Sequence, residues 1–153
     1  MNTNIEQVVL KNILTNEKYM RKVLPFVKPD YFEGTYKILF KEAGKFVGKY
    51  NKLPTAEAFK IEIDNADSFN EEQYRHAVEI IPNLFEEEKA DETWLYDSTE
   101  KWCQDRALYN AVMESISIID GKHTKLTKNA LPEILTKALG CLLYTSPSPR
   151  DLS

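Results

Sequence analysis

Residues 94–119 read WLYDSTEKWCQDRALYNAVMESISII, a run of 26 residues without proline or glycine. Six large apolar side chains recur along this run at helical intervals: Leu95, Trp102, Tyr109, Val112, Ile116 and Ile119. Four of them are spaced by seven residues, close to two turns of an α-helix, so they lie on one face. The stretch therefore predicts a single amphipathic helix about 39 Å long.

A second, shorter helix is expected after this one. Gly121 ends the first pattern, the turn from Lys122 to Lys128 is basic, and residues 131–139 again place apolar side chains at helical spacing before Gly140. The two segments predict a helical hairpin over residues 94–140. Its apolar stripe either packs wholly inside its own domain or pairs with another copy of the chain. We favour pairing, and the predicted interface comprises Leu95, Trp102, Tyr109, Val112, Ile116, Ile119, Leu135 and Leu139.

Residues 1–85 predict a globular subdomain of about five helices. Asn16 and Thr55 each precede an apolar helical pattern and can act as helix caps. Ser68 to Glu71 has the form of a capping box, and Pro82 is expected to kink or shorten the helix that follows. Residues 86–92 are almost wholly charged, and residues 86–93 are expected to form an acidic connector. The predicted fold class is all-α: a small globular helical bundle followed by a long helical hairpin.

The composition of the chain argues against several classes of function. The formal net charge of −4 argues against a strongly cationic nucleic-acid binder. Two cysteines and two histidines are too few for a disulfide framework or a zinc site by spacing, so no metal is expected. No apolar run reaches membrane-spanning length, and the N-terminus lacks a signal-peptide pattern. We therefore expect a cytoplasmic protein without a membrane partner.

Three segments of the sequence are candidates for a binding site. Residues 44–49, GKFVGK, resemble a phosphate-binding loop but have three residues between the glycines instead of four, and Tyr50 follows where Ser or Thr is required. The acidic run at residues 86–92 has enough carboxylates for a metal, but a solvated linker is the simpler interpretation. The basic turn could touch a phosphate backbone or merely be a solvated hairpin tip. No set of residues predicts catalysis.

The last 13 residues, 141–153, have no helical pattern. Their sequence resembles translated sequencing-adaptor tails, which predicts that the segment is not native and that the natural chain continues beyond Gly140. A Pro/Ser-rich disordered terminus is the alternative.

In its order of segments the chain resembles the N-terminal domain of the DnaB-type replicative helicases, particularly the form found in T-even phages. Three blocks carry the resemblance: residues 5–10 with Asn16-Glu17 and Tyr31-Phe32, then Lys52-Leu53-Pro54-Thr55, and then Trp94-Leu95, Thr99-Glu100-Lys101 and Asp105-Arg106-Ala107. Each block alone is weak, because it consists of caps, turns and apolar spacings. Their order and separations make the match fairly specific over residues 5–139.

This resemblance implies a function in DNA replication. In the family, hairpins pair between subunits, the pairs form a collar on a hexameric ring, and the collar is linked with primase binding. A RecA-like motor domain, which uses ATP and Mg²⁺ to unwind DNA, would follow. With no phosphate-binding loop in this sequence, we expect a fragment without cofactor or catalytic residues that meets DNA only through the full-length helicase, in the cytoplasm of an infected bacterial host.

Two other functions stay open at this point. One is a free-standing helical adaptor or regulator without a motor domain, which a natural stop after Gly140 would favour. The other is a small DNA-binding protein, for which the acidic charge is unfavourable and steeply salt-dependent DNA affinity would be diagnostic.

Overall fold

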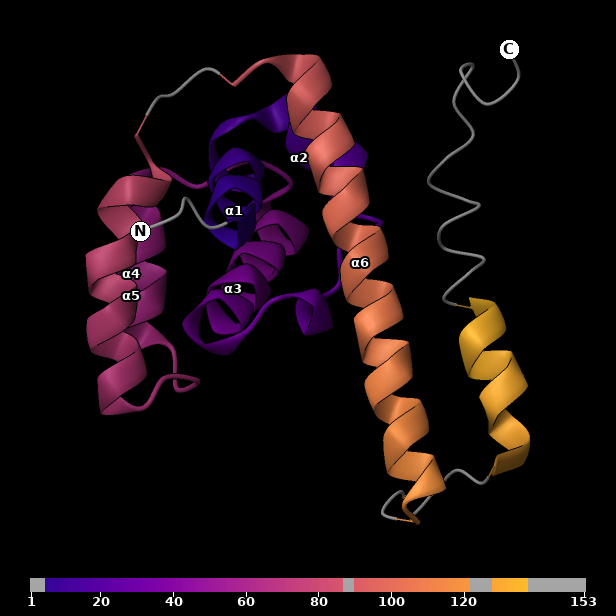
Figure 1. Ribbon diagram of the computed structural model, residues 1–153. Helices are drawn as coiled ribbons and strands as arrows, with labels where there is room; N and C mark the ends of the chain where they lie inside the picture. The colour runs from indigo at the N-terminus through magenta and orange to yellow at the C-terminus, as the bar shows by residue number, and fades with distance from the viewer. Residues whose placement is uncertain (1–4, 87–89, 122–127, 138–153) are drawn as a thin grey trace. The chain divides into compact units, whose positions relative to one another are not determined.

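The computed structural model describes residues 5–86, 90–121 and 128–137 (Figure 1). The chain divides into two compact units, Met1–Ala90 and Asp91–Ser153. Every regular element in the described ranges is an α-helix or a 3-10 helix, which confirms the all-α fold class.

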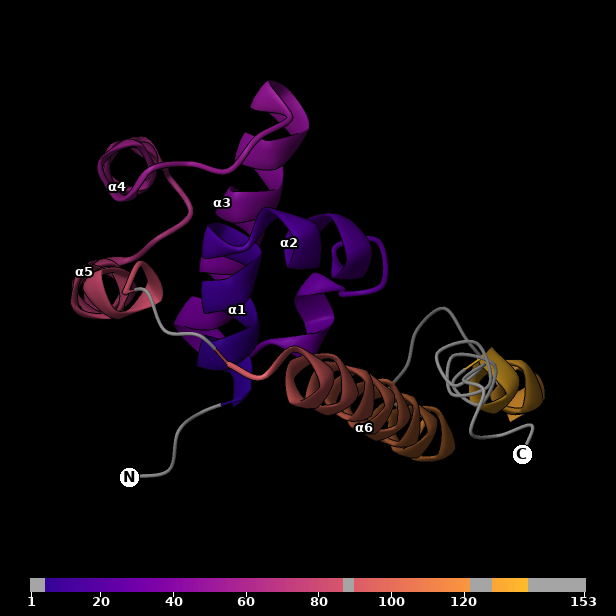
Figure 2. The ribbon, with the colours of Figure 1, turned by 90° about the horizontal axis from the view of Figure 1, so that it is seen from above.

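The first unit is a bundle of short helices. It contains α1 (Ile5–Thr15), α2 (Glu17–Val23), a 3-10 turn η1 (Pro29–Tyr31), α3 (Gly34–Tyr50), α4 (Ala56–Asn65) and α5 (Glu71–Leu84). Helix α1 contacts α2, α3 and α5, and α4 packs on α3 and α5. Figure 2 shows α1 flanked by these three neighbours.

Helix α1 is at the centre because its sequence is apolar over most of its circumference. Val9, Leu10 and Ile13 are fully buried, and Leu14 is nearly so. The side-chain Nδ2 of the buried Asn12 donates a hydrogen bond to the Val8 carbonyl at 2.8 Å, which gives this buried donor a partner within its own helix.

Helix α3 faces the bundle with an apolar stripe. Leu39, Phe40, Ala43 and Val47 are buried, and the Phe40 ring stacks on Phe32 with the ring centroids 4.8 Å apart. The helix ends at Asn51, whose φ of 54° lies in the left-handed region that asparagine tolerates. Arg21 of α2 fixes this end by donating to the Asn51 carbonyl at 3.0 Å and to its Oδ1 at 3.2 Å.

The helix caps confirm two predictions and correct a third. Asn16 and Thr55 cap α2 and α4 as expected, each accepting from a backbone N–H at 3.0 Å. The capping box of α5 is Asn70 with Gln73, two residues after the predicted pair. Both residue pairs have the required spacing, and glutamine completes the box as well as glutamate does, so the pattern alone did not choose between them.

Pro82 shortens α5 less than a central proline would. The helix continues for two residues past it and ends at Leu84, since a proline in the last turn removes one amide donor near a point where the helix ends anyway. His76 of α5 is exposed, and its Nδ1 lies 3.0 Å from Thr35 Oγ1.

The second unit begins with α6 (Glu92–Ile119), 28 residues long, which starts two residues before the predicted position. The 3-10 turn η2 (Lys128–Ala130) contacts α6, and residues 131–137 are helical. Leu139 of the predicted interface, most of the basic turn and the predicted non-native tail lie outside the described residues.

Candidate protein interface

Helix α6 is built to be long. The Asp91 carboxylate accepts the Trp94 backbone N–H at 2.9 Å and caps the first turn. Two hydroxyl side chains inside the helix donate back to backbone carbonyls, Thr99 to Leu95 at 2.7 Å and Ser115 to Ala111 at 2.8 Å, so neither interrupts it. The helix stops where Gly121 takes a φ of +73°.

The first half of α6 has a covered face. Leu95, Thr99, Trp102 and Cys103 are buried, and their spacing places them on adjacent turns of one side. Two residues of the predicted interface, Leu95 and Trp102, therefore have little surface to offer to another molecule.

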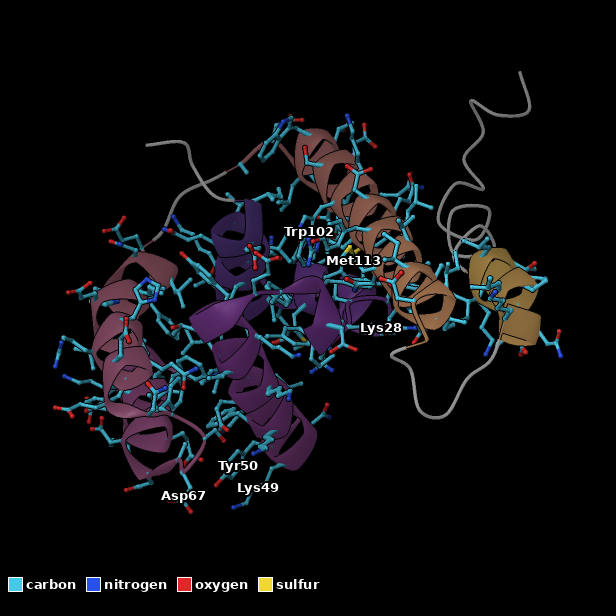
Figure 3. The ribbon with its side chains drawn as sticks, turned by 60° about the horizontal axis from the view of Figure 1, so that its bottom comes forward. Lys28, Lys49, Tyr50, Asp67, Trp102 and Met113 are labelled. Atoms are coloured by element: carbon cyan, nitrogen blue, oxygen red, sulfur yellow. The ribbon has the colours of Figure 1, made fainter. Side chains whose placement is uncertain are left out.

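The second half of α6 is different, because six of its large apolar side chains are partly exposed to solvent. Each of the six residues has between 41% and 57% of its surface exposed. They are Leu108, Tyr109, Val112, Met113, Ile116 and Ile119. At 3.6 residues per turn these six positions fall within roughly 140° of the helix circumference. We call this set the bare face of α6. Figure 3 labels Met113 on it and Trp102 in the first half of the same helix.

On the opposite side of this half, small or apolar residues are covered. Ala111 and Ile118 are buried, which leaves the bare face as the side without cover. Contiguous exposed apolar surface of this kind is uncommon on a protein that works alone, and it typically marks an interaction site.

A cation borders the bare face. The guanidinium of Arg106 lies 4.8 Å from the centroid of the Tyr109 ring, a cation–π geometry that holds the ring in place. Tyrosine and arginine are both enriched where protein interfaces bind most strongly. Arg106 and Leu108 were not in the predicted set, although Leu108 lies one turn before Val112 and could have been included by spacing.

The second helix of the predicted hairpin adds one exposed apolar position. Leu135 is 38% exposed, whereas Leu131 and Ile134 are half-buried. The predicted interface residues thus divide into two that are buried in the single chain, five that are exposed, and Leu139, outside the described ranges. The interface remains a prediction, and the bare face is the part of it available to a partner.

Of the other segments considered as sites from the sequence, only residues 44–49 are described completely; residues 87–89 of the acidic run and 122–127 of the basic turn lie outside the described residues. Residues 44–49 lie inside α3, so the GKFVGK run is helical and is not a loop. Within residues 5–86, 90–121 and 128–137, no three His, Cys, Asp or Glu side chains are grouped to hold a metal ion. No helix in these ranges is long and apolar enough to cross a membrane.

Comparison with known proteins identifies a protein of similar sequence. The chain is 30% identical over 142 residues to a DnaB-like replicative helicase of Enterobacteria phage T4. This chain is a relative of a DnaB-like replicative helicase. The match covers 87% of the chain but only 30% of the length of the phage helicase, and no protein-family model matches the chain. The resemblance to the DnaB-type helicases is therefore confirmed, and a role related to the replication helicase is supported.

Proposed function

We propose that this chain is the N-terminal collar domain of a DnaB-type replicative helicase and that it joins subunits through the bare face of α6. The similarity to the phage T4 helicase supports the replication role, and the uncovered apolar surface supports the association role. In this proposal, hairpins of two copies pair, and the pairs are joined in a hexameric ring. The ATP-dependent unwinding would belong to the full-length parent, and this chain alone would not hydrolyse ATP.

The size of the bare face suits such pairing. Fully burying one large apolar side chain contributes about 1.5–3 kcal/mol, whereas bringing two proteins together costs about 4–15 kcal/mol. Side chains that start half-exposed gain less than the full amount, so several are needed from each copy. A two-fold contact uses the same patch twice and brings together two sets of six side chains.

The proposal is tested by sedimentation velocity over a concentration series. We expect the unmutated chain to shift from monomer to dimer as concentration rises. Ile116→Asp should weaken this association by more than about tenfold, because it places a charge in an apolar contact. Ile61→Asp is the matched control, since Ile61 on α4 is 50% exposed and Ile116 is 45% exposed.

A monomer at every concentration would reject the association role. Equal weakening by both substitutions would reject the bare face as the contact. Circular dichroism of both variants should remain that of the folded unmutated chain, because neither side chain is buried.

Docking of primase, or of another replication protein, is the second part of the proposal. It rests on the resemblance to the helicase family alone. Binding of a primase to the unmutated chain by titration calorimetry would support it, and absence of binding to a chain that dimerises would remove this part while leaving the first.

A further inference from the structure

The first unit separates its charges. Residues 17–52 contain nine Lys or Arg and four Asp or Glu, whereas residues 53–86 contain two Lys or Arg and eight Asp or Glu. The two segments therefore carry net charges of +5 and −6 and nearly cancel. The positive segment holds α2 and α3, and the negative segment holds α4 and α5.

The outer side of α3 is basic. Its exposed residues are Gly34, Lys41, Lys45, Gly48, Lys49 and Tyr50, and none is acidic. Lys41, Lys45 and Lys49 follow one another at intervals of four, which spans about 12 Å along the helix. Figure 3 shows Lys49 and Tyr50 at one end of α3.

These lysines are only partly neutralised inside the unit. Lys45 pairs with the buried Glu42 carboxylate at 3.2 Å. Lys41 has no carboxylate within ion-pair distance among the described residues, and neither has Lys49, whose Nζ lies 5.3 Å from the centroid of the Tyr50 ring.

Glycines leave room beside this row. A Cβ added to Gly44 or to Gly48 would meet no atom within 4 Å, so the packing of the unit does not require glycine at either position. Glycine weakens a helix interior relative to alanine. Here it leaves a strip of α3 without side chains, on which another element can approach closely.

The outer side of α5 carries the opposite charge. Glu72 and Glu79 are exposed and seven residues apart, and Glu86 follows at the same spacing just past the helix end. None of the three forms an ion pair within the part of the chain that the structure describes. Within the helix, the span from Glu72 to Glu79 is about 10 Å, similar to the span of about 12 Å for the lysine row.

We infer that the lysine–glycine face of α3 docks on the acidic outer face of α5 in a second copy of this chain. The charges are complementary, the two helices have similar length, and each face keeps charged side chains without an ion pair among the described residues of its own unit: Lys41 and Lys49 on α3, and Glu72 and Glu79 on α5. Two copies of the lysine face would repel each other, so the lysine face of one copy meets the acidic face of the other. Because the two faces lie on different helices, this contact can be made head-to-tail. Such a contact repeats from copy to copy and gives a ring when its rotation closes.

A phosphate backbone is the other chemistry that could bind a lysine row. That alternative leaves the acidic face of α5 without a role, whereas a second copy accounts for both faces at once. The inference goes beyond the proposed function, because it uses a different surface in the other unit and does not need the bare face of α6.

The test isolates this contact by using the full chain with Tyr109→Asp and Ile116→Asp, which disable the bare face. Sedimentation equilibrium at up to about 1 mM protein should detect association at about 25 mM salt that weakens roughly tenfold or more by about 300 mM, because screening shortens the reach of surface charges. Single surface ion pairs contribute little, so weak association is expected.

Charge reversal then identifies the two faces. In the same background, Lys41→Glu with Lys49→Glu should abolish association, and so should Glu72→Lys with Glu79→Lys. Mixing these two variants should restore it, because each acidic face again meets a basic one. Lys60→Glu is the matched control on α4 and should cause no loss.

These experiments can overturn the inferred contact between α3 and α5 in several ways. Failure of the mixture to restore association, or no salt-sensitive association at all, would overturn the inference. It would also be overturned if lysine reversal removed binding of a single-stranded oligonucleotide while leaving self-association intact. Because the bare face is disabled throughout, these results are independent of whether the proposed hairpin pairing is correct.

Discussion

Helix α3 and the second half of α6 both carry a regular apolar stripe, but only the stripe of α3 is covered. Leu39 and Ala43 are fully buried in α3, whereas Val112 and Ile116 of α6 are 43% and 45% exposed. The same helical spacing therefore serves two purposes in this chain. In α3 it holds a bundle together, and in α6 it leaves a surface whose cover must come from elsewhere. Substitutions in the two stripes should consequently affect different quantities.

The largest expected difference lies within α6 itself, between two aromatic residues seven apart. Trp102 is 7% exposed and Tyr109 is 49% exposed. Trp102→Ala should lower the free energy of unfolding by about 3–5 kcal/mol, as expected for truncating a buried aromatic residue. Tyr109→Ala should change it by less than about 0.5 kcal/mol. Urea unfolding of dilute samples, followed by circular dichroism, measures both. Similar losses for the two variants would contradict the division of α6 into covered and bare halves.

A similar contrast is expected between α3 and α6 for aliphatic residues. Leu39→Ala should cost about 2–5 kcal/mol of unfolding free energy because it opens a cavity in a packed core. Val112→Ala should leave stability nearly unchanged and weaken dimerisation instead. Unfolding at low concentration and sedimentation at high concentration distinguish these effects. A stability loss from Val112→Ala as large as that from Leu39→Ala would show that its side chain is covered in the single chain.

The α5 cap provides a smaller test of local structure. Asn70→Ala removes the side-chain acceptor for the Gln73 N–H, now at 2.7 Å, and should cost about 1 kcal/mol. Ser68→Ala, at the position first expected to cap this helix, should cost less, because Ser68 Oγ instead donates to Glu42 at 3.4 Å. Thermal unfolding of both variants measures the two losses. A larger loss for Ser68→Ala than for Asn70→Ala would contradict Asn70 as the cap of α5.

The smallest expected effect is a gain in stability. Gly48→Ala should stabilise α3 by about 0.5–1 kcal/mol, since alanine has the higher helix propensity and its Cβ meets no neighbouring atom. Destabilisation in a urea titration would mean that something packs closely on this part of α3 in the single chain.

Much of the fold could be predicted from local sequence. The caps at Asn16 and Thr55 and the unbroken run at residues 94–119 are local signals, and the helices follow them. Which apolar residues would be covered was not predictable. Spacing places Trp102 and Tyr109 on one stripe, but burial depends on what packs against each part of the helix, and that is decided by tertiary structure. The charge separation between α3 and α5 does not show in the net charge of the chain, because two faces of opposite charge nearly cancel.

The most direct test of the central claim is whether the bare face becomes covered as the protein associates. Met113 lies on that face and is 47% exposed, whereas Met20 is 1% exposed and serves as the internal control. Oxidation by peroxide, followed by mass spectrometry of each methionine, reports the accessibility of both. We predict that Met113 oxidises faster than Met20 in dilute samples and is protected as concentration rises, and that Ile116→Asp removes this protection. Oxidation of Met113 at the same rate at every concentration would contradict the proposed association.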